Sequence, residues 1–488
     1  MNIQIEPPAL DKTPARLSQA EIKGIIIGLI LAMLLAALDQ TIVATAMPTI
    51  GHELGDLNNL PWIVTAYLLT STAVTPLYGK LSDIHGRRIM LLVAIGIFSI
   101  GSIACALAPT MLALGLARGL QGLGGGGLLA LSQTIIGDLV TPRERAQYQV
   151  YIASVFVISS LAGPILGGFF AEHLHWSLIF WINLPLGLLA YLMTSDKLKR
   201  LPRFERPHKL DYPGAVLLIA ATSTLLLALS WGGVHYGWGS APILTLLAAS
   251  VVLWLLFVLR LRSAAEPLIP LVLFGNQVVR TATLAACFGM GTFIGLTIYM
   301  PIYLEGVLGL SASQSGLALI PLMIGTVAGA TLSGRLMVSI RHYKRVPIAG
   351  LSFSLLATAA LAFSARGMPQ YMLEILLALL SLGLGMLLPV TTVAVQNAVA
   401  QHDLGTATAS MNFFRSLGGA IIVAVFGTLV LGGAAFAPGG SLQHLSPEAI
   451  AALAAAFRLV FVASAAGLAL ALFFISAMHE LPLHDRRA

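Results

Sequence analysis

Apolar runs recur along the whole chain, and no other feature constrains the fold as strongly. A helix needs about 20 apolar residues to cross a hydrocarbon layer of about 30 Å. Backbone polar groups must be hydrogen-bonded within lipid, so runs of this length are expected to be helices. The sequence therefore predicts an all-α membrane protein with 14 transmembrane helices. The runs cover residues 25–48, 61–79, 89–108, 111–137, 148–171, 177–195, 213–231, 242–259, 282–304, 315–338, 346–364, 371–393, 406–432 and 456–478.

The composition excludes a soluble domain. Charged residues make up 10% of the chain and hydrophobic residues 57%, with a mean hydropathy of +0.90, whereas soluble domains carry about 25% charged residues. Cys105 and Cys287 lie inside apolar runs, so both are expected to be buried thiols without a disulfide. The first run is longer than the apolar core of a signal peptide, so it is expected to be retained as a span.

The basic residues gather in alternate loops. If the N-terminus is cytoplasmic, 23 of the 27 Lys and Arg residues fall on the inner side, two on the outer side and two within spans. The positive-inside rule then predicts a multi-pass protein of the inner or plasma membrane with both termini in the cytoplasm. These loops account for the net charge of +7, so no nucleic-acid partner is expected. The long basic loop after span 6 is interpreted as an orientation signal rather than a specific site for membrane lipids.

A weak internal repeat indicates two related halves. Residues 79–81 (GKL) match residues 334–336 (GRL), and SLAGP at 160–164 resembles SLGGA at 416–420, each pair eight spans apart. Repeated halves with a site between them are typical of transporters. In the second copies, Val338 stands in place of Asp83 and Ala420 in place of Pro164. The expected organisation is a cytoplasmic tail at 1–24, an N-terminal six-helix half at 25–195, a basic cytoplasmic linker at 196–212, two inserted helices at 213–259, a cytoplasmic linker at 260–281, a C-terminal six-helix half at 282–478 and a cytoplasmic tail at 479–488.

Two charged residues in the middle of spans are candidates for proton coupling. Asp39 lies in span 1, where a charge costs about 2.5–3.5 kcal/mol, and is expected to face a central cavity. A buried carboxyl holds its proton more readily than an exposed one, so Asp39 can bind either a proton or a cationic substrate. Arg118 in span 4 is its expected partner because an arginine keeps its charge. The alternatives are a structural acid bonded to Gln40, Thr41 or helix ends, and an arginine bonded to helix carbonyls. Gln121 and Gln133 are expected to extend a polar track from Arg118.

The loop between spans 2 and 3 places an acid among bases, in the stretch LYGKLSDIHGRRIM. Asp83 and Arg87 are four residues apart, so they can pair on a helix, and Asp83 can also lie at a helix N-terminus. The bases alone would only orient the chain. We interpret the cluster as a conformational latch on the cytoplasmic side. Its residues are Gly79, Lys80, Asp83, Gly86, Arg87 and Arg88.

Six motifs together resemble a known family. They are GKLSDIHGRR (79–88), LARGLQGLGGGG (116–127), LAGPILGG (161–168), LDQTIVATAMP (38–48), WSLIFWINLPLG (176–187) and EPLIPLVLF (266–274). They occur in order at the expected spans, and the resemblance extends over about residues 25–478. The chain resembles the major facilitator superfamily and, within it, the 14-span drug:proton antiporters of the EmrB/QacA type.

The resemblance implies roles for these residues. It implies two six-helix halves, an acid at Asp39, proton coupling through Arg118 and a latch in the 79–88 loop. The motif associated with antiporters contributes Gly163, Pro164, Gly167 and Gly168, which the family uses as a gate against proton leak. Physical reasoning alone also allows simple close helix packing there, and glycines 122–127 are expected to allow it in span 4.

A substrate cavity is expected to be apolar and aromatic with few polar groups. For each candidate, lipid-facing or core packing is equally compatible with the sequence, and Arg415, in the inner half of span 13, is assigned a structural role. No acid lies mid-span in the C-terminal half. The cavity candidates are Gln40, Tyr67, Gln121, Gln133, Met290, Phe293, Tyr299, Gln396, Asn397, Asn412 and Phe413.

The sequence therefore predicts a proton-coupled antiporter that exports lipophilic, cationic drugs by alternating access, without enzymatic activity. No Walker motif or metal-ligand cluster is present, so no cofactor or metal is expected, and the proton gradient is the energy source. The expected partners are small lipophilic molecules, protons and membrane lipids; a monomer is expected, and a periplasmic adaptor is left open. The alternatives are an exporter of one metabolite or siderophore, and a non-transporting receptor or scaffold of the same fold.

Overall fold

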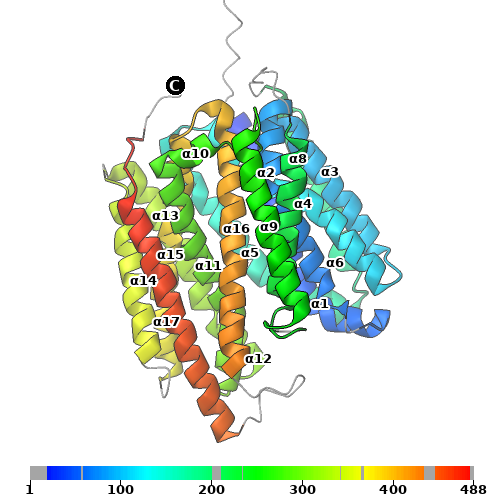
Figure 1. Cartoon of the computed structure of the whole chain (residues 1–488), viewed down its shortest axis with the longest axis vertical. Coiled ribbons are helices and arrows are strands. Elements are labelled where there is room, and N and C mark those ends of the chain that lie inside the picture. The colour runs from blue at the N-terminus through cyan, green and yellow to red at the C-terminus, as the bar shows by residue number, and fades with distance from the viewer. Residues whose placement is uncertain are drawn as a thin grey trace, which may run out of the picture.

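Long helices that run roughly side by side make up nearly all of the described chain (Figure 1). The structure is a computed structural model, and it describes residues 19–56, 59–200, 210–233, 235–340, 342–363, 368–433 and 446–483. No β-strand occurs within these ranges. The prediction of an all-α protein is confirmed.

The helices follow one another through two sets joined by a helical pair. The first set contains α1 (Gln19–Leu54), α2 (Trp62–His85), α3 (Arg87–Ala106), α4 (Met111–Leu139), α5 (Pro142–His173), α6 (Leu178–Trp181), α7 (Asn183–Ser195) and the short η2 (Lys197–Arg200). The pair is α8 (Tyr212–Trp231) and α9 (Ala241–Ser263). The second set contains α10 (Leu271–Gly275), α11 (Gln277–Gly306), α12 (Ala312–Ala318), α13 (Ile320–Ser339), α14 (Arg345–Phe363), α15 (Gln370–Asn397), η3 (Gln401–Asp403), α16 (Leu404–Gly433) and α17 (Pro447–Ala477).

Twelve segments of the described chain are long and apolar enough to cross a membrane. The predicted spans 61–79 and 111–137 correspond to α2 and α4, which have 24 and 29 residues but are not among the twelve. Both helices are comparatively polar because they face protein: α4 is buried along most of its length, and α2 packs against α4, α8 and α16. Twelve of the fourteen predicted spans therefore meet the length and hydropathy expected of a membrane span, and α2 and α4 do not.

The helical pair α8–α9 lies at the seam between the two sets. Helix α8 packs against α2 of the first set and α16 of the second. Trp254 of α9 contacts Phe413 of α16, with ring centroids 6.2 Å apart. Away from this seam, the buried apolar side chains of the two sets form separate clusters, except that Ala146 of α5 joins the cluster of the second set. Each set therefore has its own core.

Glycines of α4 allow close helix packing, as predicted for the run 122–127. A Cβ on Gly122 would collide with the Tyr67 carbonyl, and one on Gly126 with the Ser71 carbonyl, both in α2. A Cβ on Gly124 would collide with the backbone of α3. Small residues let helices approach in this way inside membranes, and α4 consequently lies between α2 and α3.

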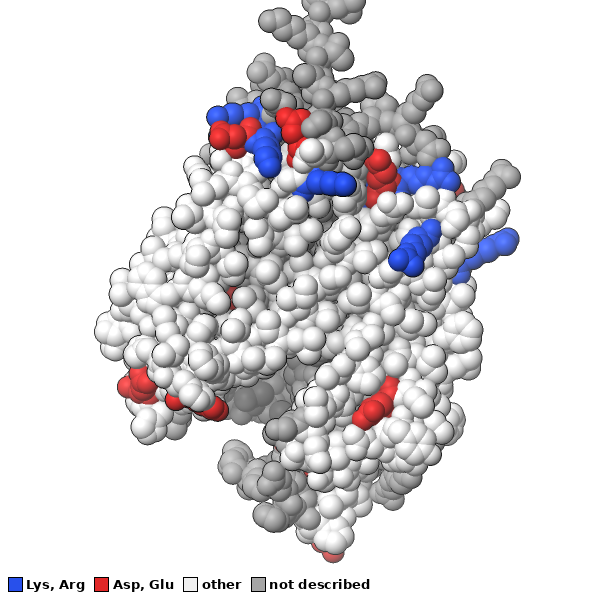
Figure 2. Space-filling view, turned by 180° about the vertical axis from the view of Figure 1, so that it is seen from behind, with Lys and Arg blue, Asp and Glu red and all other residues white. Residues whose placement is uncertain are grey.

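Positive charge gathers at one end of the molecule, which we call the basic end (Figure 2). Lys80, Arg87, Arg143 and Lys344 lie there, near the ends of α2, α3, α5 and α14. Helix α1 begins and α17 ends at the same end: Gly24 packs against Lys197, and Glu480 accepts a bond from the Lys344 backbone N at 3.0 Å. Both Cys105 and Cys287 are free thiols, as predicted.

Candidate functional site

Asp39 and Arg118 form a buried ion pair inside the first set of helices. Arg118 Nη1 lies 2.5 Å from Asp39 Oδ2, and the two side chains are 1% and 0% exposed. The predicted partnership between the spans is confirmed. A buried pair stays favourable only if the remaining polar atoms also find partners.

Polar side chains from α4, α7 and α3 complete the cluster around Asp39. Gln121 Nε2 of α4 donates to Asp39 Oδ1 at 2.8 Å, and Asn183 Nδ2 of α7 donates to the same oxygen at 3.0 Å. Both amides also donate to Ser102 Oγ of α3, at 2.9 and 3.3 Å. Three side-chain donors, from Arg118, Gln121 and Asn183, therefore hold the acid. Gln40 and Thr41, the local alternative, do not donate to it in these bonds.

Arg118 links this cluster to α2. Its Nε donates to the Ile63 carbonyl at 2.9 Å, and its Cζ lies 4.4 Å from the centre of the Tyr67 ring. On another side it lies 5.7 Å from the centre of the Phe180 ring. A guanidinium over an aromatic face is a favourable contact. Because Arg118 contacts both Asp39 and α2, a change in the charge of Asp39 would alter the contacts between Arg118 and α2.

A large cavity lies between the two sets of helices. Its volume is about 740 Å³, and helices α1, α2, α5, α8, α11 and α16 contribute to its wall. It includes Thr65 near the start of α2, Gly233 after α8 and Thr428 near the end of α16, all remote from the basic end. The surface is hollowed between the halves at this opposite end (Figure 2).

Six of the eleven predicted cavity residues line this cavity: Gln40, Tyr67, Gln133, Met290, Phe293 and Tyr299. Arg118 also lines it, but Asp39 does not. The expectation that Asp39 faces the cavity is therefore wrong, since Arg118 and its neighbours enclose the carboxylate completely.

The other five candidates have different surroundings. Gln121 belongs to the Asp39 cluster. Gln396 Nε2 donates to the Gln133 carbonyl at 3.2 Å, and Asn412 Nδ2 donates to Gln133 Oε1 at 2.8 Å, so these amides join α4 to α15 and α16. Asn397 Nδ2 donates to the Pro482 carbonyl at 3.1 Å, at the basic end. Phe413 packs against Trp254 of α9, on the side of α16 that faces the α8–α9 pair.

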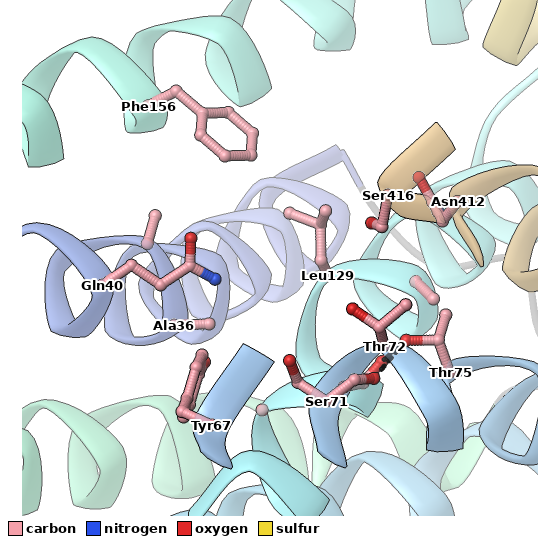
Figure 3. A pocket seen from close by; sticks show the side chains of 14 residues that line it. Ala36, Gln40, Tyr67, Ser71, Thr72, Thr75, Leu129, Phe156, Asn412 and Ser416 are labelled. Carbon is pink, nitrogen blue, oxygen red and sulfur yellow. Dashed lines mark hydrogen bonds between the residues drawn. The ribbon is translucent and has the colours of Figure 1, made fainter. Parts of the chain in front are cut away.

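A small polar niche continues from the large cavity (Figure 3). Gln40 of α1 and the hydroxyls of Ser71, Thr72 and Thr75 on α2 line it, with Asn412 and Ser416 of α16 on the other side. Tyr67 and Phe156 belong to both spaces. The niche therefore brings polar atoms of both sets together beside the aromatic ring that covers Arg118.

At the basic end, Asp83 joins the two sets of helices. Its carboxylate accepts from the backbone N atoms of Gly405 and Thr406, at 3.2 and 2.8 Å, and from Thr406 Oγ1 at 2.5 Å. These groups form the N-terminus of α16, where the helix dipole favours an anion. The predicted pairing with Arg87 and the predicted position at a helix N-terminus are both confirmed.

The rest of the 79–88 loop fixes this carboxylate in place. Arg87 contacts Asp83, and its Nε also donates to Asp138 Oδ2 of α4 at 2.8 Å. Arg88 Nε donates to the Ser195 carbonyl at 2.5 Å. Gly86 has a φ of 91° between α2 and α3, a conformation that favours glycine. Gly79 packs against the backbone at Gly405, and Lys80 is buried in the same helix.

The second copy of the repeat makes a related contact across the halves. Gly334 of α13 packs against the Ala146 carbonyl of α5. Val338, in the position of Asp83, supplies its backbone carbonyl instead of a carboxylate and accepts from Arg143 Nε at 3.0 Å. Two cross-contacts therefore close the basic end: α2 on α16, and α13 on α5.

The predicted antiporter motif lies where α5 packs on α1. A Cβ on Gly163 would collide with Thr41 Oγ1, and one on Gly167 with the Ile42 carbonyl. Thr41 Oγ1 donates to the Ser159 carbonyl at 2.7 Å. Pro164 lies within the same helix, whereas Gly168 has open space around its Cα. Two of the four motif residues, Gly163 and Gly167, thus belong to a close contact with residues 41–45 of α1, just beyond Asp39.

Asn183, Ser102 and Asp138 are site residues that sequence reasoning missed. Asn183 lies inside the quoted motif WSLIFWINLPLG, where an amide within an apolar run was an available signal. Asp138 precedes a helix end and looks like an ordinary loop acid. Its contact with Arg87, 51 positions earlier in the chain, depends on tertiary structure.

Comparison with known proteins agrees with this architecture. The family model described as Major Facilitator Superfamily matches residues 29–423. The multidrug transporter protein MdtP of Bacillus subtilis is 35% identical over 471 residues, which cover 94% of this chain and 85% of that protein. Multidrug resistance protein 3 of the same organism is 34% identical over 420 residues, which cover 86% of this chain and 81% of that protein.

Solved structures show the same fold. The human organic anion transporter MFSD10 superposes with a TM-score of 0.66 at 18% identity, over 93% of this chain and 99% of that one. The chain belongs to the major facilitator superfamily. It is a multi-pass membrane transporter with multidrug-transporter and efflux-pump relatives, and not an enzyme.

Proposed function

We propose that this protein exports amphipathic small molecules in exchange for protons, by alternating access of the central cavity. The names of its relatives support efflux, and the cavity between the halves supplies a site of suitable size. The observation that carries proton exchange is the buried Asp39–Arg118 pair beside that cavity. The proton gradient is the energy source, and no cofactor is invoked.

The basic end faces the cytoplasm in this proposal. The positive-inside rule places the Lys- and Arg-rich loops there, together with both ends of the chain. Helices α2 and α4 then also cross the membrane, surrounded by other helices rather than by lipid, which gives fourteen spans in all. The contacts at the basic end close the cytoplasmic side, so the structure corresponds to an outward-facing state. The membrane is the inner or plasma membrane.

Protonation of Asp39 is the coupling step. The ionised carboxylate holds Arg118, and neutralising it removes the charge–charge attraction while leaving a guanidinium beside the cavity. Arg118 also contacts Ile63 and Tyr67 of α2, so its rearrangement changes the position of that helix. In this way one proton alters a wall of the cavity.

Helix α2 links the proton site to the cytoplasmic latch. Ile63 and Tyr67 lie near its start and Asp83 near its end, about 30 Å apart at a rise of about 1.5 Å per residue. A movement of α2 that starts at Arg118 would pull Asp83 from the N-terminus of α16. Release of the latch would open the cytoplasmic side and close the outer side.

Gradient collapse in proteoliposomes tests the proposal. The purified protein is reconstituted into vesicles with an acidic interior and a trapped pH dye, and ethidium or carboxyfluorescein is added outside. We expect a dye-dependent loss of the gradient in the wild type and none in Asp39→Asn. Asp196→Asn is the matched control, because Asp196 is an exposed acid that pairs with Lys199 outside the Asp39 cluster. A gradient that survives every dye in the wild type would contradict the proposal.

A further inference from the structure

Arg415 is a buried cation in the wall of the cavity. It lies on α16 and is 9% exposed. Its neighbour Ser416 and Gly419, one turn further on, line the same cavity. Phe413 and Leu417, on the other side of the helix, pack in the cluster formed with α8 and α9. The guanidinium side of α16 therefore faces the central space rather than lipid.

Arg415 differs from every other buried arginine in the described chain. Arg87 contacts Asp83 and Asp138, Arg118 contacts Asp39, and Arg145 donates to the carbonyls of Gly137 and Val140. Arg415 has no hydrogen-bond or ion-pair partner among the described residues. A buried charge without a partner is costly. That cost favours the arrival of a partner from outside the protein.

The cavity supplies no negative charge to balance it. Among the described residues that line the cavity, the charged ones are Arg118 and Arg415, and neither Asp nor Glu occurs. Asp39, which lies on the side of Arg118 away from the cavity, already neutralises the charge of Arg118. The wall therefore carries one uncompensated positive charge, at Arg415. A lipophilic cation would be repelled by this charge and would find no carboxylate in the described wall.

The remaining lining suits an apolar or aromatic body. Phe156, Met290, Phe293 and Tyr299 contribute large apolar surfaces, and Gln133 and Gln149 add amide groups. A guanidinium binds carboxylates and related oxyanions through paired hydrogen bonds in a water-poor site. We infer that the cavity takes amphipathic organic anions, with a carboxylate, sulfonate or phenolate group on Arg415. The inference depends on the proposed function, in which this cavity carries the exported molecule.

The sequence-based expectation of a cationic substrate depended on Asp39 facing the cavity. The structure places that carboxylate in an enclosed cluster with Arg118, Gln121 and Asn183. The charge that faces the cavity is thus opposite in sign to the one expected. Substrate selection and proton binding are separated in this arrangement, the former at Arg415 and the latter at Asp39.

Binding of a matched dye pair tests the inference without requiring transport. Carboxyfluorescein and rhodamine 6G are xanthene dyes of similar size, the first an anion and the second a cation. Fluorescence polarisation is measured with purified protein in a neutral detergent. We expect the wild type to bind the anion at least tenfold more tightly than the cation. Equal affinity, or preference for the cation, would overturn the inference.

Variants locate the effect at Arg415. Arg415→Gln is expected to lower affinity for carboxyfluorescein at least tenfold and to leave affinity for rhodamine 6G undiminished, while Arg415→Lys restores part of the loss. Arg458→Gln is the control, since it removes an exposed arginine of α17 outside the cavity lining. Unchanged anion binding in Arg415→Gln would also overturn the inference. If that variant does not fold, Arg415→Lys and the wild-type preference still decide.

Export assays in energised inside-out vesicles separate this inference from the proposed function. Export of carboxyfluorescein that fails in Arg415→Gln supports both. Export of rhodamine 6G alone contradicts the anion inference and leaves the exporter proposal standing. Export of neither dye, with tight and Arg415-dependent binding of the anion, contradicts the exporter proposal and retains the site.

Discussion

Asp83 and Thr406 hold the two halves of the protein together at the basic end. Asp83 Oδ2 accepts from the Thr406 backbone N at 2.8 Å and from its hydroxyl at 2.5 Å. The two residues are 323 positions apart in the chain. One carboxylate therefore connects the end of α2 to the start of α16, across the interface that must open in an alternating-access cycle.

Asp83→Asn is expected to weaken this closure. The neutral amide loses the favourable interaction with the helix N-terminus and with Arg87, at a cost of about 1–3 kcal/mol. Spin labels at His85 and Gln401, two surface positions on either side of the contact, report the separation by pulsed electron paramagnetic resonance. We expect the distances to shift to longer values in Asp83→Asn. Distances identical to those in the wild type and in Asp196→Asn would argue against a latch.

Asn183→Ala is expected to slow proton-coupled transport. Asn183 donates to Asp39 Oδ1 at 3.0 Å, and its loss leaves that oxygen with the Gln121 amide as its remaining side-chain donor. A hydrogen bond to a charged group contributes about 1.5–3 kcal/mol. The rate of dye-dependent gradient loss in proteoliposomes should therefore fall about tenfold or more. A rate equal to that of the wild type would contradict a role for the Asn183 amide at the proton site.

Two adjacent glycines of α5 provide a matched pair. Gly167→Ala places a methyl group against Thr45 Oγ1 and the Ile42 carbonyl, so α5 and α1 must separate near Asp39. Gly168→Ala meets no atom within 4 Å. We expect a lower thermal unfolding temperature and reduced transport for Gly167→Ala alone. Equal effects of both substitutions would contradict the close-packing role assigned to the motif.

Export of an anion should respond strongly to membrane potential. Exchange of one entering proton for one leaving monovalent anion moves two positive charges inward, each worth about 2.3 kcal/mol per 100 mV. A one-for-one exchange with a monovalent cation moves no net charge. Collapsing the potential with valinomycin and potassium, at a constant pH gradient, should therefore slow the export of an anionic dye. Insensitivity to valinomycin would contradict anion:proton exchange.

Much of the site was predictable because it depends on residues that are unusual in their context. An acid and an arginine in mid-span are costly, so Asp39 and Arg118 attract attention in the sequence and prove to be partners. The Asp83–Arg87 spacing likewise predicts an ion pair within a helix. The halves were visible as a repeat because Gly79 and Gly334 make corresponding close contacts.

What sequence reasoning missed depends on side-chain direction and on contacts between distant segments. Asp39 was assigned to the cavity, but the rotation of α1 turns it towards α4 and α7. Arg415 was assigned a structural role, although it faces the cavity with no partner among the described residues.

Substrate-induced proton release tests the central claim most directly. Purified protein in weakly buffered detergent solution is mixed with carboxyfluorescein, and a pH electrode records the protons released on binding. The account predicts release from the wild type and from Asp196→Asn, and none from Asp39→Asn. Undiminished release from Asp39→Asn would contradict the account, because the exchanged proton would then be bound elsewhere.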